Sequence, residues 1–195
     1  IFNHNEAKLY QWIEEYDPPL FQKIQDLVQK GKWHIMGGWY LQPDCVMSSG
    51  ESIFRQMEKG LNYFREKFGC RPRTAINVDS FGHDRGLVQL LRKSGYTSYL
   101  VGRPSLEVCK APGPDFLWEG YDGTCIPVHL AAEGYNSGLG KVRRKLEYYR
   151  RQEGTDNSVL ALWGIGNHGG GPSKEDLDEI SLLQKEWEKE GVQLI

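Results

Sequence analysis

The stretch TAINVDSFGHDRGLVQLLRKSGYTSYLVGRP, residues 74–104, decides the fold class. It opens with a short apolar run, TAINV, and passes through a glycine-containing turn into the helical pattern GLVQLLRKSG. It then ends in a second β-rich run, YTSYLVG. A helix between two strands predicts a parallel pair, because parallel strands need a long crossover connection. The stretch therefore predicts an α/β fold.

The same alternation continues on the N-terminal side. Residues 17–33 and 48–69 show apolar positions at helical spacing, with Asp17 as N-cap of the first helix and a Ser48–Glu51 capping box in the second. Between them, WHIM (33–36) predicts a short buried strand. The apolar stripe of the second helix is expected to face the core, and its members are Phe54, Met57, Leu61, Phe64 and Phe68.

The C-terminal side adds one departure from the parallel pattern. Asp122-Gly123 lies between two β-rich runs within residues 115–130, which predicts an antiparallel hairpin. A helix over 141–152, a strand over 158–166 and a helix over 173–191 follow. Because neither an internal repeat nor a low-complexity linker is visible, we expect residues 1–195 to form a single domain.

The composition excludes several classes of function. The chain has 195 residues and 39% hydrophobic content, enough for a sizeable core but too polar for a membrane span. The net charge of -2 comes from interspersed charges of both signs, so nucleic acid is not an expected partner. The four cysteines form no C-x-x-C pair, which favours reduced thiols in a cytoplasmic protein.

Polar residues gather where the predicted strands end, and chemistry gathers at those ends in parallel α/β folds. Carboxylate, amide and imidazole groups interleaved with aromatic rings suit a neutral sugar, whose hydroxyls need fixed partners and whose C–H face stacks on rings. The polar residues are Asp44, Asp79, Arg103, Asn167 and His168, and the aromatic residues are Trp39, Phe81 and Trp163.

Several of these residues also have structural interpretations. Asp79 precedes a helix and suits an N-cap, and the glycines of GNHGGGPS suit a tight turn in which Ser173 caps the last helix. His83 has no neighbour at metal-ligand spacing, which favours an interior histidine over a metal ligand. Arg103 directly after a buried strand requires a carboxylate partner, and Asp79 is the candidate.

Four segments occur in one order that resembles the catalytic domain of glycoside hydrolase family 38, the α-mannosidases, and especially its bacterial members. The resemblance covers nearly the whole chain, and its most specific element is the D-S-F-G-H sequence beginning at Asp79. The four segments are GKWHIMGGWYLQPD, SGESIFRQMEKGLNYFREKFG, INVDSFGHDRGLVQLLRKSGYTSYLVGRP and LWGIGNHGGGPSKEDL.

The resemblance implies part of a seven-stranded β/α barrel, incomplete at both ends, that hydrolyses mannose-containing oligosaccharides with retention at one zinc ion. By the same resemblance, Asp79 is both zinc ligand and nucleophile, Phe81 packs beside the sugar, and Arg103 holds Asp79 as an oriented carboxylate. The remaining expected sugar contacts are Trp39, Tyr135, Asn136, Asn167 and His168.

The chain also departs from the family pattern. The family's H-x-D segment and a later histidine, which supply further zinc ligands, are not in this sequence. The eukaryotic acid/base aspartate aligns with the GNHGGG loop, where neutral Asn167 cannot transfer a proton and His168 can in principle. The acid/base residue is therefore left open, and we expect the isolated chain to bind zinc weakly and to be inactive.

The ends of the chain and the alternatives complete the sequence-based picture. The chain begins without an initiator Met and closes on GVQLI, so we expect a piece of a longer polypeptide whose open sheet edges favour a homo-oligomer. A noncatalytic carbohydrate-binding domain on a degenerate barrel is the alternative to the enzyme. A metal-dependent deacetylase would need an H-x-x-x-H arrangement, which this sequence lacks.

Overall fold

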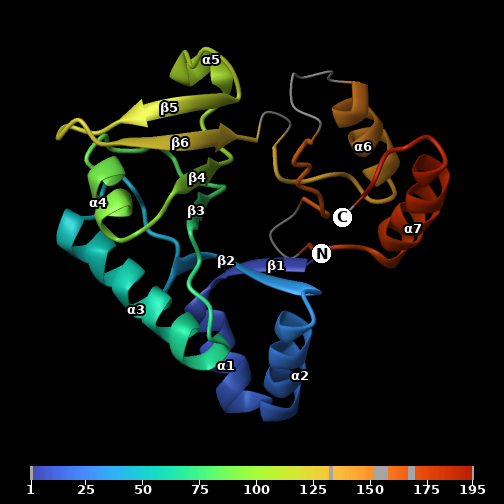
Figure 1. The fold of residues 1–195 in the computed structure, drawn as a ribbon, viewed down its shortest axis with the longest axis horizontal. Coiled ribbons are helices and arrows are strands. Elements are labelled where there is room, and N and C mark those ends of the chain that lie inside the picture. Colours follow the sequence, from blue (N-terminus) through green and yellow to red (C-terminus); the bar gives the residue numbers. More distant parts are fainter. Residues whose placement is uncertain (1, 132–133, 152–157, 167–169, 195) are drawn as a thin grey trace. The chain divides into compact units, whose positions relative to one another are not determined.

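The computed structural model describes residues 2–131, 134–151, 158–166 and 170–194 (Figure 1). They divide into two compact units, one within residues 1–132 and one within 133–195. The first unit contains β1 (Phe2–Glu6), α1 (Ala7–Tyr16), α2 (Pro18–Gln29), β2 (Trp33–Trp39), α3 (Gly50–Phe68), β3 (Thr74–Asn77), α4 (Leu87–Lys93), β4 (Ser98–Val101), α5 (Leu106–Cys109), β5 (Asp115–Glu119) and β6 (Cys125–Leu130). The second contains α6 (Val142–Arg151) and α7 (Lys174–Glu188).

Two sheets organise the first unit. One pairs β1 with β2 in parallel, and the other has the order β3-β4-β6-β5. In this second sheet β3, β4 and β6 run parallel, and β5 is antiparallel to β6. Helix α4 forms the crossover between β3 and β4, as residues 74–104 predict. The α/β fold class is confirmed, with mixed sheets.

The predicted hairpin joins β5 and β6. The backbone N–H of Gly120 donates to the carbonyl of Thr124 at 2.8 Å, and the carboxylate of Asp122 accepts from the Thr124 N–H at 3.1 Å. Gly123 occupies the turn with a φ of 77°, a conformation that favours glycine. Asp122 thus accepts a backbone hydrogen bond within the turn, and Gly123 adopts the positive φ that the turn requires.

Helices α3 and α4 lie on the same side of β3 and β4 (Figure 1). Their apolar faces pack against the strands in one core, to which α3 contributes Ile53, Met57 and Leu61 and α4 contributes Leu87, Val88 and Leu91. A second core joins α1, α2 and the end of α3 through Tyr10, Phe21, Ile24 and Phe64. β1 and α1 were not predicted from the sequence.

Helix α3 differs from its prediction in two details. Its N-cap is Ser49, whose hydroxyl accepts from the Ser52 N–H at 3.2 Å, and not Ser48. Phe54, assigned to the buried stripe, is exposed, and the neighbouring Ile53 packs in the core instead. Ile53, Met57 and Leu61 follow one another at four-residue spacing, so they share the face of α3 that packs in the core.

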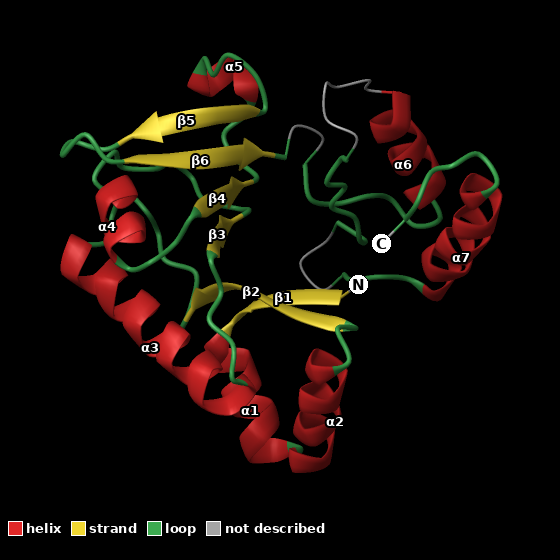
Figure 2. Ribbon diagram, in the orientation of Figure 1, coloured by secondary structure: helices red, strands yellow, loops and turns green. Residues whose placement is uncertain are grey.

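The strand predicted over residues 158–166 does not form. In the described part of the second unit, the only sheet-like pairing of this segment is an isolated bridge between Ser137 and Ile165. Val159 and Leu160 are exposed. Figure 2 shows loop in place of a strand here. An apolar run becomes a strand only where a neighbouring strand pairs with its backbone groups.

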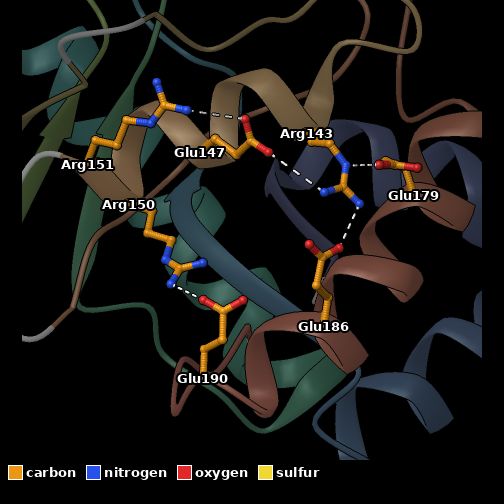
Figure 3. Close-up of polar contacts among 7 residues, drawn as sticks. All are labelled: Arg143, Glu147, Arg150, Arg151, Glu179, Glu186 and Glu190. Carbon is orange, nitrogen blue, oxygen red and sulfur yellow. Dashed lines mark hydrogen bonds and ion pairs between the residues drawn. The ribbon is translucent and has the colours of Figure 1, made fainter.

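In the second unit, an ion-pair network connects α6 with α7 and its C-terminal end, beside an apolar core of Val142, Leu146, Leu183 and Trp187 (Figure 3). The guanidinium of Arg143 contacts Glu179, lies 3.0 Å from Glu186 and 3.7 Å from Glu147. Arg150 pairs with Glu190 at 2.5 Å. Arg143 also lowers the pKa of Glu186 through its hydrogen bond and charge. The network therefore joins the two helices along one face.

A buried carboxylate supplements this network. Asp176 lies in the first turn of α7, is fully buried, and accepts the Val142 N–H at the start of α6 at 3.1 Å. Its other oxygen accepts from the Ser173 hydroxyl at 2.6 Å. One side chain therefore satisfies donors at the beginnings of both helices.

Substitution of Gly60 in α3 tests how closely this helix packs against β2 in the first unit. A Cβ there would lie 2.6 Å from the backbone nitrogen of Tyr40 and closer still to the carbonyl oxygen of Gly38. We expect Gly60→Ala to lower the free energy of unfolding by about 2–3 kcal/mol, because the overlap is with backbone that cannot move aside. Urea unfolding at constant m-value measures the change.

Gly50→Ala in the same helix is the matched control. Its Cβ would meet only a Leu90 methyl group at 3.6 Å, an ordinary contact. We expect stability to be unchanged or to rise by up to about 1 kcal/mol, because alanine favours helix more than glycine does. Equal effects of the two substitutions would contradict the close approach of α3 to β2.

Arg143→Met tests the α6–α7 network by its pH dependence. Because the folded-state pKa of Glu186 lies below its ordinary value of 4.5, the ion pair stabilises the folded state above that pH. This contribution disappears as the pH falls through the folded-state pKa. We therefore expect wild type to lose more stability than Arg143→Met on acidification below about pH 4.5.

Arg144→Met is the control for this experiment, since Arg144 is exposed and forms no ion pair among the residues that the structure describes. Thermal midpoints at neutral and acid pH give the comparison. An acid-induced loss in Arg143→Met as large as that of wild type would show that the network does not stabilise the unit.

Candidate functional site

The candidate site lies where β3 and β4 end. Asn77 and Val101 are the last residues of the two strands and are register partners. Asp79 and Arg103 each follow two residues later. Parallel strands end at the same edge of a sheet, so the register itself brings these two side chains together.

Asp79 and Arg103 form a close ion pair. Nε of Arg103 lies 2.7 Å from Oδ1 of Asp79, and the two side chains are 49% and 43% exposed. Oδ1 itself is buried and has no hydrogen-bond donor among the described residues. The guanidinium therefore approaches Oδ1 as a charge and does not aim an N–H at it. The pairing that the sequence predicted is present.

Phe81 completes this cluster on the solvent side. Its ring lies beneath the guanidinium carbon of Arg103 at 5.6 Å from the ring centroid, and its side chain is 83% exposed. An exposed phenylalanine costs hydration free energy unless something covers it. A carboxylate, a guanidinium and an open aromatic face thus meet at one strand edge.

The interpretation of Asp79 as an N-cap is wrong. Helix α4 begins at Leu87 with Gly86 at the cap position. Asp84 serves that turn, since its Oδ1 accepts the Gly86 N–H at 2.7 Å. Asp44, after β2, likewise accepts the N–H groups of its own loop from Val46 and Met47.

Trp39 does not line the candidate site in this structure. It is completely buried, and its indole N–H donates to the carbonyl of Ile76 in β3 at 2.8 Å. Its ring packs against Tyr96 with centroids 6.1 Å apart. The structure therefore assigns Trp39 to the core that supports β3, and not to a sugar-facing surface as predicted.

The other predicted sugar contacts lie elsewhere in the chain. Tyr135 and Asn136 belong to the second unit, where the Asn136 carbonyl accepts from the ammonium of Lys145 at 2.7 Å. Asn167 and His168 lie outside the described residues. Their roles remain predictions.

A chain of polar side chains lies behind Asp79. The amide nitrogen of Asn77 donates to the hydroxyl of Ser80 at 3.0 Å and to the thiol of Cys45 at 3.1 Å. The Cys45 sulfur lies 4.0 Å from the hydroxyl of Tyr99 in β4. Burial raises the pKa of the Cys45 thiol, which favours its neutral form. The Oδ1 atom of Asn77 is buried without a donor among the described residues.

His83 connects this chain to Arg103. One ring nitrogen lies 2.9 Å from the Tyr99 hydroxyl and the other 2.7 Å from the carbonyl oxygen of Arg103. Both ring nitrogens of this partly buried histidine therefore contact protein groups, and that His83 is not a metal ligand stays a prediction. The sequence missed Tyr99 and Cys45, although the alternation in SYLV turns Tyr99 and Val101 to the same face.

A cavity of about 210 Å³ lies nearby, between the loop after β2 and the start of α4. Neither Asp79 nor Arg103 lines it. The polar residues that line it are Ser48, Asp84 and Gln89, and the apolar ones include Val46, Ile53, Leu87 and Leu90. The cavity adjoins the Asp79 loop without being part of the cluster.

The described residues contain no group of three or more histidine, cysteine, aspartate or glutamate side chains placed to hold a metal ion. Asp79 is a single carboxylate, and zinc sites use three or four protein ligands. Within the described chain, Asp79 can therefore contribute to a zinc site but cannot form one.

Comparison with known proteins gives the family. The sequence profile of the glycosyl hydrolases family 38 N-terminal domain matches residues 1–193. The chain belongs to glycosyl hydrolases family 38. The resemblance of the sequence to this family is thereby confirmed.

Two curated relatives are similar in sequence to this family 38 domain. It is 30% identical over 187 residues to alpha-mannosidase G of Dictyostelium discoideum, covering 94% of this chain and 17% of the relative. It is 30% identical over 186 residues to human alpha-mannosidase 2C1, covering 94% of this chain and 18% of the relative. The chain thus spans less than a fifth of either relative.

The structure of an alpha-mannosidase from Enterococcus faecalis V583 superimposes with a TM-score of 0.73 at 21% identity. The match covers 93% of this chain and 21% of the other. At this identity the likeness concerns the fold alone. Among the described residues, no helix of the family 38 domain combines the length and apolar character that crossing a membrane requires.

Arg103→Met tests whether the ion pair stabilises the fold of this family 38 domain. Because both partners are about half exposed, we expect the free energy of unfolding to change by less than about 1 kcal/mol. Arg85→Met is the matched control, since Arg85 pairs with Glu119 at 3.2 Å and is similarly exposed. A loss above about 2 kcal/mol in the Arg103 variant alone would make the pair a structural one.

Proposed function

We propose that the complete natural protein containing this chain is a retaining α-mannosidase in which Asp79 is the nucleophile. The observation that supports it is the Asp79–Arg103 pair at the ends of β3 and β4, beside the exposed ring of Phe81. The matching family and the names of the curated relatives supply the substrate class, a mannose-containing oligosaccharide.

The reaction types fit the residues. A carboxylate oxygen of Asp79 attacks the anomeric carbon while an acid protonates the departing glycosidic oxygen, which gives a covalent glycosyl-enzyme intermediate. A water molecule then cleaves the bond to Asp79, and the same acid/base group takes the water's proton. Arg103, 2.7 Å from Oδ1, offsets the negative charge of the carboxylate and favours its ionised form. Phe81 offers a face on which a sugar ring can pack.

Zinc belongs to the same proposal. Asp79, a carboxylate that is 43% exposed at the strand end, would be one of its ligands. Further ligands would have to come from outside the described chain, because it contains no ligand cluster of three or more. A bound zinc ion supplies Lewis acidity and orients sugar hydroxyls.

The architecture and setting of the domain are proposed on related grounds. The parallel order of β3, β4 and β6 and the fold likeness to the E. faecalis α-mannosidase support a partial seven-stranded β/α barrel as one domain over residues 1–195. All four cysteines are free, which supports a cytoplasmic setting.

The proposal includes further sugar contacts, made by Tyr135, Asn136, Asn167 and His168. We also expect the protein to form a homo-oligomer.

Asp79→Asn in the complete protein tests the mechanism. We expect kcat for an aryl α-mannoside to fall by about a thousandfold or more, because a neutral amide cannot form the glycosyl-enzyme bond. Steady-state hydrolysis, with and without a zinc chelator, measures the effect, and the chelator should also abolish activity in wild type.

Asp84→Asn is the matched control, since Asp84 lies on the same loop and its contact with Gly86 is one that an asparagine oxygen can keep. Its activity should stay close to that of wild type. Retained activity in Asp79→Asn would refute the role of Asp79. A well-folded wild type that binds mannose-containing glycans without hydrolysing them would indicate the noncatalytic carbohydrate-binding domain instead.

A further inference from the structure

His83 uses both ring nitrogens in contacts between different elements. It lies on the loop after β3, yet its Nε2 is 2.7 Å from the carbonyl oxygen of Arg103 and its Nδ1 is 2.9 Å from the hydroxyl of Tyr99. Tyr99 lies within β4, and Arg103 lies two residues after Val101, the last residue of that strand. The His83 side chain thus connects its own loop to β4 and to Arg103, which follows β4.

The chemistry of the partners determines where the proton is. A carbonyl oxygen can only accept, so Nε2 carries the hydrogen and donates it to Arg103. Burial lowers the pKa of His83, which favours the neutral imidazole. In that form Nδ1 accepts, and the Tyr99 hydroxyl donates to it. The two bonds run in one direction, from Tyr99 through His83 to Arg103.

The surroundings fix the ring in this orientation. Tyr99 meets it nearly edge-on with centroids 5.6 Å apart, and Trp118 of β5 does so at 6.2 Å. Tyr99 and Trp118 stack on each other with an angle of 14° between their planes. Tyr99 is almost fully buried in the core. The position of the imidazole is therefore set by the sheet and not by its own loop.

We propose that His83 is a positioning residue for the reaction: by holding the carbonyl of Arg103, it holds the guanidinium of Arg103 against Asp79. This inference rests on the proposed roles of Asp79 and Arg103. The ion pair is about half exposed, so solvent weakens its own attraction. A half-exposed arginine side chain has many rotamers, and fixing its backbone limits where the guanidinium can reach.

The alternative is that His83 only ties the β3 loop to β4. In that case its loss would lower stability and would reduce activity in proportion to the unfolded fraction. If His83 positions Arg103, activity instead depends on a hydrogen-bond donor at the place of Nε2. The two amide side chains separate these cases, since a glutamine nitrogen can reach the position of Nε2 and the shorter asparagine reaches only the position of Nδ1.

The test compares His83→Gln with His83→Asn in the complete protein. With an aryl α-mannoside, we expect the glutamine variant to keep kcat within a few-fold of wild type. The asparagine variant should lose about 10–100-fold in kcat with little change in KM, because the nucleophile is misplaced while sugar contacts remain. Thermal midpoints of the two variants should be similar. Equal losses of kcat in both variants would overturn the positioning role.

Crystal structures of the two variants test the inference without relying on activity. In His83→Gln the Nε–Oδ1 distance between Arg103 and Asp79 should stay near 2.7 Å, and in His83→Asn it should exceed the ion-pair limit of about 4 Å. An intact pair in the asparagine variant would refute the inference. If wild type hydrolyses no α-mannoside, the proposed function fails, and these structures still decide whether His83 positions Arg103.

Discussion

The contact of the main chains of β3 and β4 at Gly102 is the constraint on which the candidate site depends. A Cβ at residue 102 would overlap the carbonyl oxygen of Val78 and lie 2.9 Å from its Cα. The Gly102 N–H donates to the carbonyl of Asn77 at 3.1 Å. Asp79 and Arg103 come directly after these residues on their own segments. The 2.7 Å ion pair thus follows from a backbone approach that only glycine permits.

The same region contains polar groups that a purely structural core would not keep. Asn77 is fully buried, and its Oδ1 lacks a donor among the described residues, as does the buried Oδ1 of Asp79. Each unsatisfied buried polar atom costs about 1–3 kcal/mol. Oδ1 of Asp79 faces the guanidinium of Arg103 at 2.7 Å, so this cost falls on Asn77, at the strand end that leads to the candidate site.

The sequence predicted those features that local chemistry determines. The Asp122-Gly123 turn, the crossover over residues 74–104 and the pairing of Arg103 with Asp79 each depend on a turn preference, a period or a charge that neighbouring residues specify. The predictions of a sugar contact at Trp39 and of a strand over residues 158–166 were wrong for a common reason. Whether an aromatic ring at a strand end faces core or solvent, and whether an apolar run pairs as a strand, depends on distant partners that local pattern does not encode.

The geometry also constrains which atom of Asp79 can react. Oδ1 is buried beneath the approach of Arg103, although the side chain as a whole is 43% exposed. Its accessible surface therefore lies on the remainder of the side chain, which includes Oδ2. In the proposed mechanism, Oδ2 would therefore be the reacting oxygen, and Arg103 would stay beside Oδ1. Burial lowers the pKa of His83, which favours a neutral ring that adds no second positive charge to this arrangement. In the proposed mechanism, the arginine beside Oδ1 would leave the other oxygen for nucleophilic attack.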